Sequence, residues 1–243
     1  MMPAVTANTA LFLDIDGTLL DLARTPDRVK VPRELLRALE KLTHHLSGAL
    51  AFVSGRSLES IDTLFAPFRP AAIGTHGGEI RGADGTIVRG QPLSGKVAEI
   101  FAGLAENIPG LLLEDKRSAL ALHYRLAPEA QPVLMSAMEK HARLFESEKV
   151  HILHGKAVIE ARPAGVDKGT AVTVLAKQKP FLGRTILFGG DDTTDLDVFR
   201  ILPQLGGSGF SVGQQFPGAD YIFESPLEVR RWLTAVAAEE ALR

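Results

Sequence analysis

The sequence has no cysteine, no long uncharged apolar run and no excess of positive charge. Without cysteine, disulfides, thiolate metal sites and cysteine nucleophiles are excluded, and a reducing cytoplasm is the location that we expect. No apolar run approaches the roughly 18 residues that a membrane helix needs, and residues 1–9 lack the basic start of a secretory signal. The 27 basic and 29 acidic residues give a formal net charge of -2. We therefore expect no nucleic-acid or membrane partner, and no protein partner is implied.

What the sequence does contain is typical of a globular protein with a sizeable core. Of its 243 residues, 45% are hydrophobic and 23% are charged, which is the ordinary composition of such proteins. The length suits one domain with a smaller domain inserted in it. Because the net charge is so small, local positive groups would have to hold an anionic substrate.

Short apolar segments alternate with helical patterns towards both ends of the chain. Leucines recur at three- and four-residue steps after Pro32, which predicts a helix with one apolar face. A second helix is predicted after Lys168, and a last one after Ser225, where Pro226 and Glu228 suit a capping box. Strand, helix and strand in succession predict an α/β fold with a doubly wound parallel sheet. The predicted strands are 10–13, 49–53, 71–75, 185–188, 210–212 and 221–223.

The pattern changes between residues 81 and 162, where it reads helix, two strands, helix, two strands. Consecutive hairpins indicate antiparallel pairing. We therefore predict that residues 81–162 form an inserted α+β cap, a lid, between two halves of a Rossmann-like catalytic core, 1–80 and 163–243. The hairpin strands are expected at 111–114, 120–125, 151–154 and 157–162.

Two groups of carboxylates directly follow predicted strands. Residues 14–18 read Asp-Ile-Asp-Gly-Thr, and residues 190–195 read Gly-Asp-Asp-Thr-Thr-Asp. Carboxylates beside a buried strand are costly unless they bind a metal or transfer protons. A turn with a helix-capping Asp would also explain the first group, and a charged helix start the second. Three crowded carboxylates in the second group favour a bound cation.

Four motifs, in their order along the chain, resemble those of the haloacid-dehalogenase phosphatases. Residues 14–18 resemble the first motif, and Ser54, after the second predicted strand, resembles the second. Lys168 resembles the third motif and residues 190–195 the fourth, with the predicted cap between the second and the third. The resemblance therefore spans nearly the whole chain and implies a phosphatase of this type.

The resemblance also implies the role of each catalytic residue. Asp14 would be the nucleophile that forms an aspartyl phosphate, and Asp16 the general acid and base. Taken alone, Ser54 would be a turn residue and Lys168 a solvated surface group. In this family they would hold the phosphate, Ser54 by a hydrogen bond and Lys168 by its charge.

Magnesium is the cofactor that the resemblance implies. A hard divalent cation reduces the repulsion between a carboxylate nucleophile and an anionic phosphate. The implied ligands are Asp14, the backbone carbonyl of Asp16, and Asp191, with Asp192 and Asp195 acting directly or through water.

Two further segments resemble the trehalose-6-phosphate phosphatases among these enzymes. Residues 74–79 resemble their Gly-x-His-Gly-x-Glu stretch, and residues 155–163 their Gly-Lys-x-x-x-Glu-x-Arg-Pro stretch. A disaccharide offers many hydroxyls, which charged side chains bind with strong hydrogen bonds. The substrate contacts that the resemblance implies are Arg56, His76, Glu79, Lys156, Glu160 and Arg162.

Other interpretations of these residues stay open. Glu160 and Arg162 also suit a solvated strand face, and His76 suits packing beside a glycine turn. Phosphatases of sucrose phosphate or mannosylglycerate phosphate, and a hexose phosphomutase, share the motif set. A catalytically silent sugar-phosphate sensor is a further alternative, although a sensor has no need of both Asp14 and Asp16. We expect a Mg²⁺-dependent phosphatase that hydrolyses a small sugar phosphate, trehalose 6-phosphate, to trehalose and phosphate.

Overall fold

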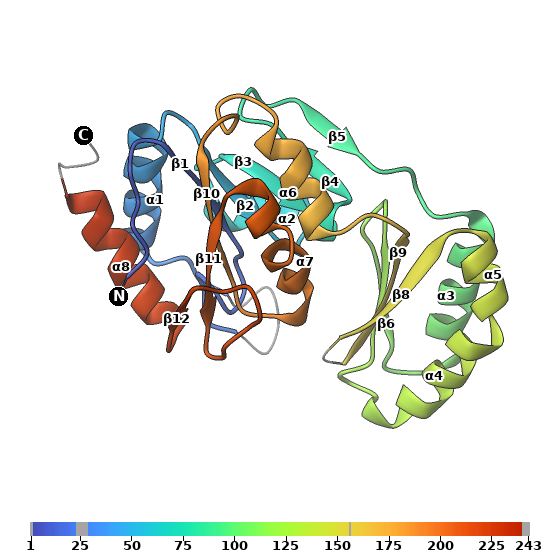
Figure 1. The fold of residues 1–243 in the computed structure, drawn as a ribbon. Coiled ribbons are helices and arrows are strands. Elements are labelled where there is room, and N and C mark those ends of the chain that lie inside the picture. Colours follow the sequence, from blue (N-terminus) through green and yellow to red (C-terminus); the bar gives the residue numbers. More distant parts are fainter. Residues whose placement is uncertain (1, 23–28, 156, 240–243) are drawn as a thin grey trace. The chain divides into compact units, whose positions relative to one another are not determined.

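The structure is a computed structural model that describes residues 2–22, 29–155 and 157–239. The chain divides into two compact units, Met1–Val88 with Asp167–Arg243 and Arg89–Val166 (Figure 1). These divisions lie a few residues beyond the boundaries after residues 80 and 162 that the sequence suggests. The assignment of a catalytic core and a cap to these segments stays a prediction.

An eight-stranded sheet forms the centre of the first unit. The strands from β12 to β3 run parallel to one another, and β4 pairs antiparallel with β3. The α/β class and the doubly wound parallel sheet are therefore confirmed. From one edge to the other, the strands are β12 (Tyr221–Phe223), β11 (Ser208–Val212), β10 (Thr185–Gly190), β1 (Thr9–Leu13), β2 (Leu50–Val53), β3 (Ala71–Gly74), β4 (Glu79–Arg81) and β5 (Ile87–Arg89).

Five α-helices accompany this sheet within the described residues. Helix α1 buries Leu35, Leu39 and Leu42, as the leucine spacing predicts, and it packs against α8. Figure 1 shows α1 and α8 on one side of the strands and α6 and α7 on the other. The helices are α1 (Arg33–His45), α2 (Leu58–Phe65), α6 (Lys168–Ala176), α7 (Leu196–Phe199) and α8 (Pro226–Ala238).

The prediction of a capping box at the start of α8 is wrong. Ser225 occupies the N-cap, but its side chain makes no capping hydrogen bond. The carboxylate of Glu228 instead accepts a hydrogen bond from the backbone N–H of Glu224 at 2.8 Å. A capping box does form at α6, where Asp167 accepts from the N–H of Thr170 at 2.7 Å. This box fixes the helix start that carries Lys168.

The second unit has its own sheet and its own hydrophobic core. Its four strands are antiparallel in the order β6-β7-β9-β8, which confirms the two predicted hairpins. Phe101, Leu122 and Leu134 are fully buried in its core, and its helices cover one face of the sheet (Figure 1). The predicted second helix is two short ones in succession. The elements are α3 (Gly95–Asn107), β6 (Leu112–Asp115), β7 (Leu120–His123), α4 (Gln131–Lys140), α5 (Ala142–Ser147), β8 (Val150–Gly155) and β9 (Val158–Pro163).

None of the helices in the described part of the chain has the length and apolar character that a membrane crossing requires.

The packing of the Phe210 ring against β10 depends on Gly189. A Cβ atom at Gly189 would lie 2.1 Å from the ring of Phe210, which is fully buried and packs against Phe223 and Trp232. We expect Gly189→Ala to lower the free energy of unfolding by about 1–3 kcal/mol, because the ring must move within a packed core. Urea denaturation monitored by circular dichroism would measure this change.

Two further variants separate the clash from the general effect of replacing a glycine. Adding Phe210→Leu to Gly189→Ala should recover part of the lost stability, because the smaller side chain leaves room for the methyl group. A methyl group at Gly103 in α3 would meet no atom within 4 Å, so Gly103→Ala should be neutral or stabilising by up to about 1 kcal/mol. An unchanged stability of Gly189→Ala would contradict the packing argument.

Candidate active site

The predicted site residues Asp14, Ser54 and Asp191 directly follow three adjacent strands, β1, β2 and β10. Leu13, the last residue of β1, pairs with Gly189 of β10 on one side and with Phe52 of β2 on the other. Asp14 continues this ladder, because its N–H donates to the carbonyl of Gly189 at 2.9 Å. The chain leaves β1 towards β2 and returns beside β1 as β10. Doubly wound sheets bind their ligands at such a reversal of strand order.

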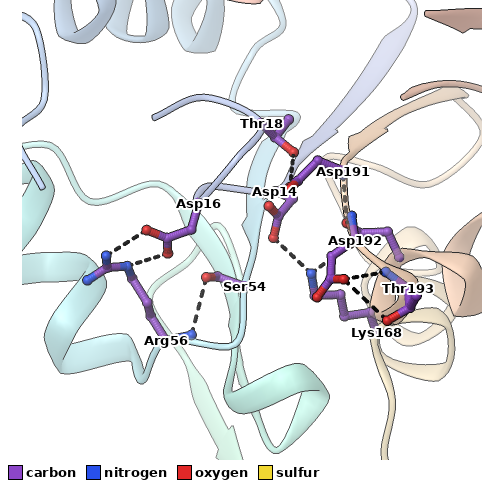
Figure 2. Close-up of polar contacts among 10 residues, drawn as sticks. Asp14, Asp16, Thr18, Ser54, Arg56, Lys168, Asp191, Asp192 and Thr193 are labelled. Carbon is purple, nitrogen blue, oxygen red and sulfur yellow. Dashed lines mark hydrogen bonds and ion pairs between the residues drawn. The ribbon is translucent and has the colours of Figure 1, made fainter. Parts of the chain in front are cut away.

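Lys168 links two of these carboxylates through its buried ammonium group. Its Nζ lies 2.8 Å from Oδ1 of Asp14 (Figure 2) and 2.6 Å from Oδ1 of Asp195. Burial alone would lower the pKa of Lys168, which is 2% exposed, but the two carboxylates raise that pKa well above its ordinary value. The lysine is therefore charged in the folded protein. Lys168 belongs to the third motif in the sequence, and in the structure it contacts Asp14 of the first motif and Asp195 of the fourth.

Asp195 has both of its carboxylate oxygens occupied by protein donors. While Oδ1 accepts from Lys168, Oδ2 accepts from the backbone N–H groups of Asp191 and Asp192 at 2.9 and 3.0 Å. The side chain is fully buried. Asp195 thus holds the loop after β10 and the ammonium of Lys168 in place, and it has less capacity than Asp191 to bind a metal directly.

Residues of the first motif also hold Asp191. The buried hydroxyl of Thr18 donates to Oδ1 of Asp191 at 2.9 Å. Gly17 has a φ of +90°, and a Cβ there would lie 2.0 Å from Oδ2 of the same carboxylate. Only glycine combines this backbone conformation with so close an approach. The turn after β1 therefore orients Asp191 from two sides.

The residues present fit a hard divalent cation. Within the described ranges, the one group of metal-ligating side chains comprises Asp14, Asp191 and Asp195, whose ligand atoms lie within 4.8 Å of one another. Burial, more than the neighbouring carboxylates, raises the pKa of Asp14 well above its ordinary value and that of Asp191 to about 6. An oxygen-seeking cation would stabilise both as carboxylates. Asp192 lies outside this group, because it is exposed and caps the N–H of Thr193 at 2.7 Å.

Asp16 faces away from this group and towards Arg56. The guanidinium donates to both carboxylate oxygens of Asp16, from Nε at 2.5 Å and from Nη2 at 2.6 Å (Figure 2). Ser54, which is buried, accepts from the backbone N–H of Arg56 at 3.2 Å. Ser54 and Arg56 follow β2, which explains why they lie beside the loop after β1.

The two predicted contacts in the segment 74–79 have different surroundings. His76 has a φ of 51°, and a Cβ on Gly55 would lie 2.3 Å from its ring nitrogen Nε2, so the ring packs on the motif that follows β2. Glu79 is buried, and its carboxylate accepts from the backbone N–H of Leu58, the first residue of α2, at 2.8 Å. Such a bond stabilises the helix start. The predicted substrate contacts of His76 and Glu79 remain predictions.

The remaining predicted substrate contacts belong to the second unit. Glu160 in β9 is buried and accepts from Nζ of Lys116 at 2.8 Å. Arg162, two residues further along the same strand, is buried as well. Their neighbours Ile159 and Ala161 belong to the hydrophobic core of the unit, so Glu160 and Arg162 project from the opposite face of the sheet. Lys156 lies outside the described residues.

The sequence does not predict the contacts that two residues, Thr18 and Lys116, make with the predicted site residues. Thr18 carries no charge, and only the approach of the loop after β10 gives its hydroxyl a role. Lys116 lies in the turn between β6 and β7, and it meets Glu160 because β7 pairs with β9. The position of Thr18 within the first motif is the only sequence feature that suggests a role for its hydroxyl. Nothing in the sequence suggests that Lys116, a lysine in a short turn, contacts Glu160.

Three comparisons with known proteins show what this chain is similar to. The sequence model of the trehalose-phosphatase family matches residues 12–216. A probable trehalose-phosphate phosphatase of Sinorhizobium fredii is 43% identical over 95% of this chain and 88% of that protein. The trehalose-6-phosphate phosphatase of Escherichia coli is 34% identical over 96% of this chain and 88% of that protein. The C-terminal domain of the C. albicans trehalose-6-phosphate phosphatase shares the fold, with a TM-score of 0.81 at 24% identity over 96% of this chain and 92% of that one.

The raised pKa values of Asp14 and Asp191 predict how stability depends on pH without metal. The ordinary value of both groups is 3.8, so between about pH 4 and pH 6 the folded protein binds more protons than the unfolded chain. Stability should therefore fall as the pH rises through this window. Thermal unfolding in a chelating buffer would measure this fall, and added Mg²⁺ should offset it because the ion binds the folded state.

Matched variants identify the groups responsible. Asp191→Asn removes one of the two titrating carboxyls and should reduce the fall in melting temperature. Asp84 has a pKa that hydrogen bonds from Thr86 lower, so Asp84→Asn should leave the fall in place. The explanation is wrong if Asp191→Asn and the unaltered protein show the same pH dependence.

Proposed function

The chain belongs to the trehalose-phosphatase family, and on that premise we propose that it hydrolyses trehalose 6-phosphate to trehalose and phosphate in a Mg²⁺-dependent reaction. One observation carries this proposal most directly. Asp14 stands at the carboxyl end of a central strand, 5% exposed and paired with the ammonium of Lys168 at 2.8 Å. A buried carboxylate beside a fixed cation is the arrangement that a nucleophile needs when it attacks an anionic phosphate.

In the first step, a carboxylate oxygen of Asp14 attacks phosphorus and the bond between phosphorus and the sugar oxygen breaks. Asp16 donates a proton to the leaving oxygen, and an aspartyl phosphate remains on Asp14. The ammonium of Lys168 stabilises the negative charge that develops on the phosphoryl group. Ser54 Oγ accepts a hydrogen bond from the backbone N–H of Arg56, and its own hydrogen would donate to a phosphate oxygen.

In the second step, water attacks phosphorus and Asp16 takes the proton that the water loses. The bond between phosphorus and Asp14 then breaks, which releases phosphate and restores the carboxylate. The same residue thus serves as acid and then as base. Asp14 itself transfers no proton in either step, and it is paired with the ammonium of Lys168.

We propose that Asp14, Asp191 and the backbone carbonyl of Asp16 hold Mg²⁺ directly. Asp195, whose oxygens are occupied by Lys168 and two N–H groups, would act on the ion only through the position of Asp191. When bound, the ion supplies positive charge that offsets the repulsion between Asp14 and the phosphate. Asp192 is the weakest candidate, because its carboxylate caps Thr193.

The choice of trehalose 6-phosphate is supported by the names of the relatives and by charged residues of the second unit. Glu160 and Arg162 are buried on the sheet face opposite its hydrophobic core, where solvated strand residues would be exposed. We propose that they contact the sugar hydroxyls, together with Lys156. In the first unit, His76 and Glu79 retain their predicted contacts as part of this proposal.

Phosphate release from a panel of sugar phosphates tests the proposed reaction. We expect release from trehalose 6-phosphate in the presence of Mg²⁺ and none after chelation, since the carboxylate cluster then lacks its cation. Asp14→Asn should lower the rate by at least about 10⁴-fold, because no aspartyl phosphate can form. An unchanged circular dichroism spectrum would show that the variant is folded.

The outcomes of this panel separate substrate from mechanism. Release from a different sugar phosphate would retain the mechanism and refute trehalose 6-phosphate as the substrate. Near-normal turnover by Asp14→Asn would refute the assignment of Asp14 as the nucleophile. If the unaltered protein released phosphate from none of the esters, the result would favour a sugar-phosphate sensor.

The proposed sugar contact of Glu160 makes a prediction about selectivity. Glu160→Gln keeps a hydrogen-bonding group but removes the charge, so kcat/KM for trehalose 6-phosphate should fall by about 10- to 100-fold. The value for p-nitrophenyl phosphate, which has no sugar, should fall far less. Glu114 pairs with His123 at 2.9 Å on the same sheet, so Glu114→Gln is a matched control. Equal losses on both substrates would indicate a structural role for Glu160.

A further inference from the structure

The pairing of Arg56 with Asp16 has a more specific geometry than a surface ion pair. Nε and Nη2 of the guanidinium each donate to a different carboxylate oxygen, at 2.5 and 2.6 Å. The Arg56 side chain is 11% exposed and the Asp16 side chain 30%. A planar fork that bonds both oxygens fixes the position and also the rotation of a carboxylate, which a lysine ammonium cannot do.

Arg56 is itself held by the residues around it. Its backbone N–H donates to Ser54, and Nη1 donates to the hydroxyl of Ser60 at 3.4 Å. Ser60 lies in the first turn of α2, whose N-cap Ser57 accepts from the N–H of Ser60. The guanidinium is thus anchored to a helix at one end and to Asp16 at the other, and three of its five N–H groups are committed within the protein.

Within the described ranges, the side chain of Asp16 is oriented by its two hydrogen bonds from Arg56. It lies in the turn between β1 and Leu20, where Gly17 adopts a φ of +90°. Proton transfer to a leaving oxygen needs a carboxyl group in hydrogen-bonding reach and in the right direction. An Asp16 that carries a proton on one oxygen would still have the other oxygen free to accept from Arg56.

We infer that Arg56 is a positioning residue that aims Asp16 at the leaving oxygen, in place of the substrate contact that the sequence suggests. The inference rests on the proposed function, because it assigns Arg56 to the acid step of that reaction. The inference predicts that the loss of Arg56 affects esters with poor leaving groups more than esters with good ones. A poor leaving group needs the proton from Asp16, whereas a good one departs without it.

The dependence of kcat/KM on the leaving group tests the inference. We would measure phenyl, 4-nitrophenyl and 2,4-dinitrophenyl phosphate, none of which contains a sugar, together with trehalose 6-phosphate. Arg56→Met should lose about 100-fold on phenyl phosphate but less than about 10-fold on the dinitrophenyl ester, in line with the contribution of a general acid. The plot of log kcat/KM against the pKa of the leaving group should become steeper, as it should in Asp16→Asn.

Further variants sharpen the test. Arg56→Lys keeps the charge but cannot bond both oxygens, so its slope should lie between those of Arg56→Met and the unaltered enzyme. Arg81 provides a matched control, since its Nη1 contacts both carboxylate oxygens of Asp62 at 2.7 and 2.9 Å and is buried. Arg81→Met should leave the slope unchanged, and so should Arg69→Met, which removes an exposed partner of the same Asp62.

Each other outcome overturns the inference. Equal losses of Arg56→Met on all esters would assign Arg56 to phosphate binding or to the fold. A loss confined to trehalose 6-phosphate, with an unchanged slope among the aryl esters, would assign it to the sugar. If the unaltered enzyme hydrolysed none of the esters, the proposed function itself would be refuted. This outcome is therefore distinguishable from those that refute only the role of Arg56.

Discussion

The arrangement of this site depends on the ion pairs that the buried ammonium of Lys168 makes with Asp14 and Asp195. A positive charge at the start of a helix is unfavourable with respect to the helix dipole, and burial adds to its cost. The ion pairs with Asp14 and Asp195 offset both. Because these partners come from the ends of β1 and β10, the charge also fixes α6 against the sheet. The capping box of Asp167 and Thr170 then stabilises the helix start that holds the ammonium. A structure without this lysine would leave two buried carboxylates without a counter-ion.

Much of this fold could be predicted from the sequence, and the exceptions have physical causes. The central strands are continuous apolar runs, because both faces of a parallel sheet are covered. The sequence therefore predicts β1, β2 and β10 to within one or two residues of their observed ends. The edge strands β4 and β5 have three residues each, and β5 is exposed throughout, so neither leaves an apolar run to recognise. Helix α2 follows β2 almost directly, and its eight residues give little periodicity. Its start is defined by Ser57 and by the distant Glu79.

For the site, the motifs predicted which residues gather but not how each is bonded. Asp14, Asp191 and Asp195 do meet, since β1 and β10 are neighbours in the sheet. Lys168, the first residue of α6, joins them through its ion pairs with Asp14 and Asp195. The bonds of Asp195 to two N–H groups depend on the path of the loop after β10, which the letters of the fourth motif leave open. The same holds for Asp192, an acidic neighbour that caps Thr193. A motif therefore predicts a set of carboxylates, and the backbone decides which of them retains free oxygens for a cation.

The two aspartates of the first motif show how one residue type can serve two chemical purposes. They are two residues apart, yet Asp14 is 5% exposed and faces Lys168, while Asp16 is more exposed and faces Arg56. A lysine is a single point charge, and it leaves the second oxygen of Asp14 available for the proposed attack on phosphorus. An arginine bonds both oxygens of Asp16 and so controls the direction of the group to which we assign the proton transfers. The partner cation, more than the carboxylate itself, thus separates the proposed nucleophile from the proposed general acid. This separation follows from strand order, because Arg56 comes from the end of β2 on one side of β1, and the carboxylate that binds Lys168 with Asp14 comes from the loop after β10 on the other.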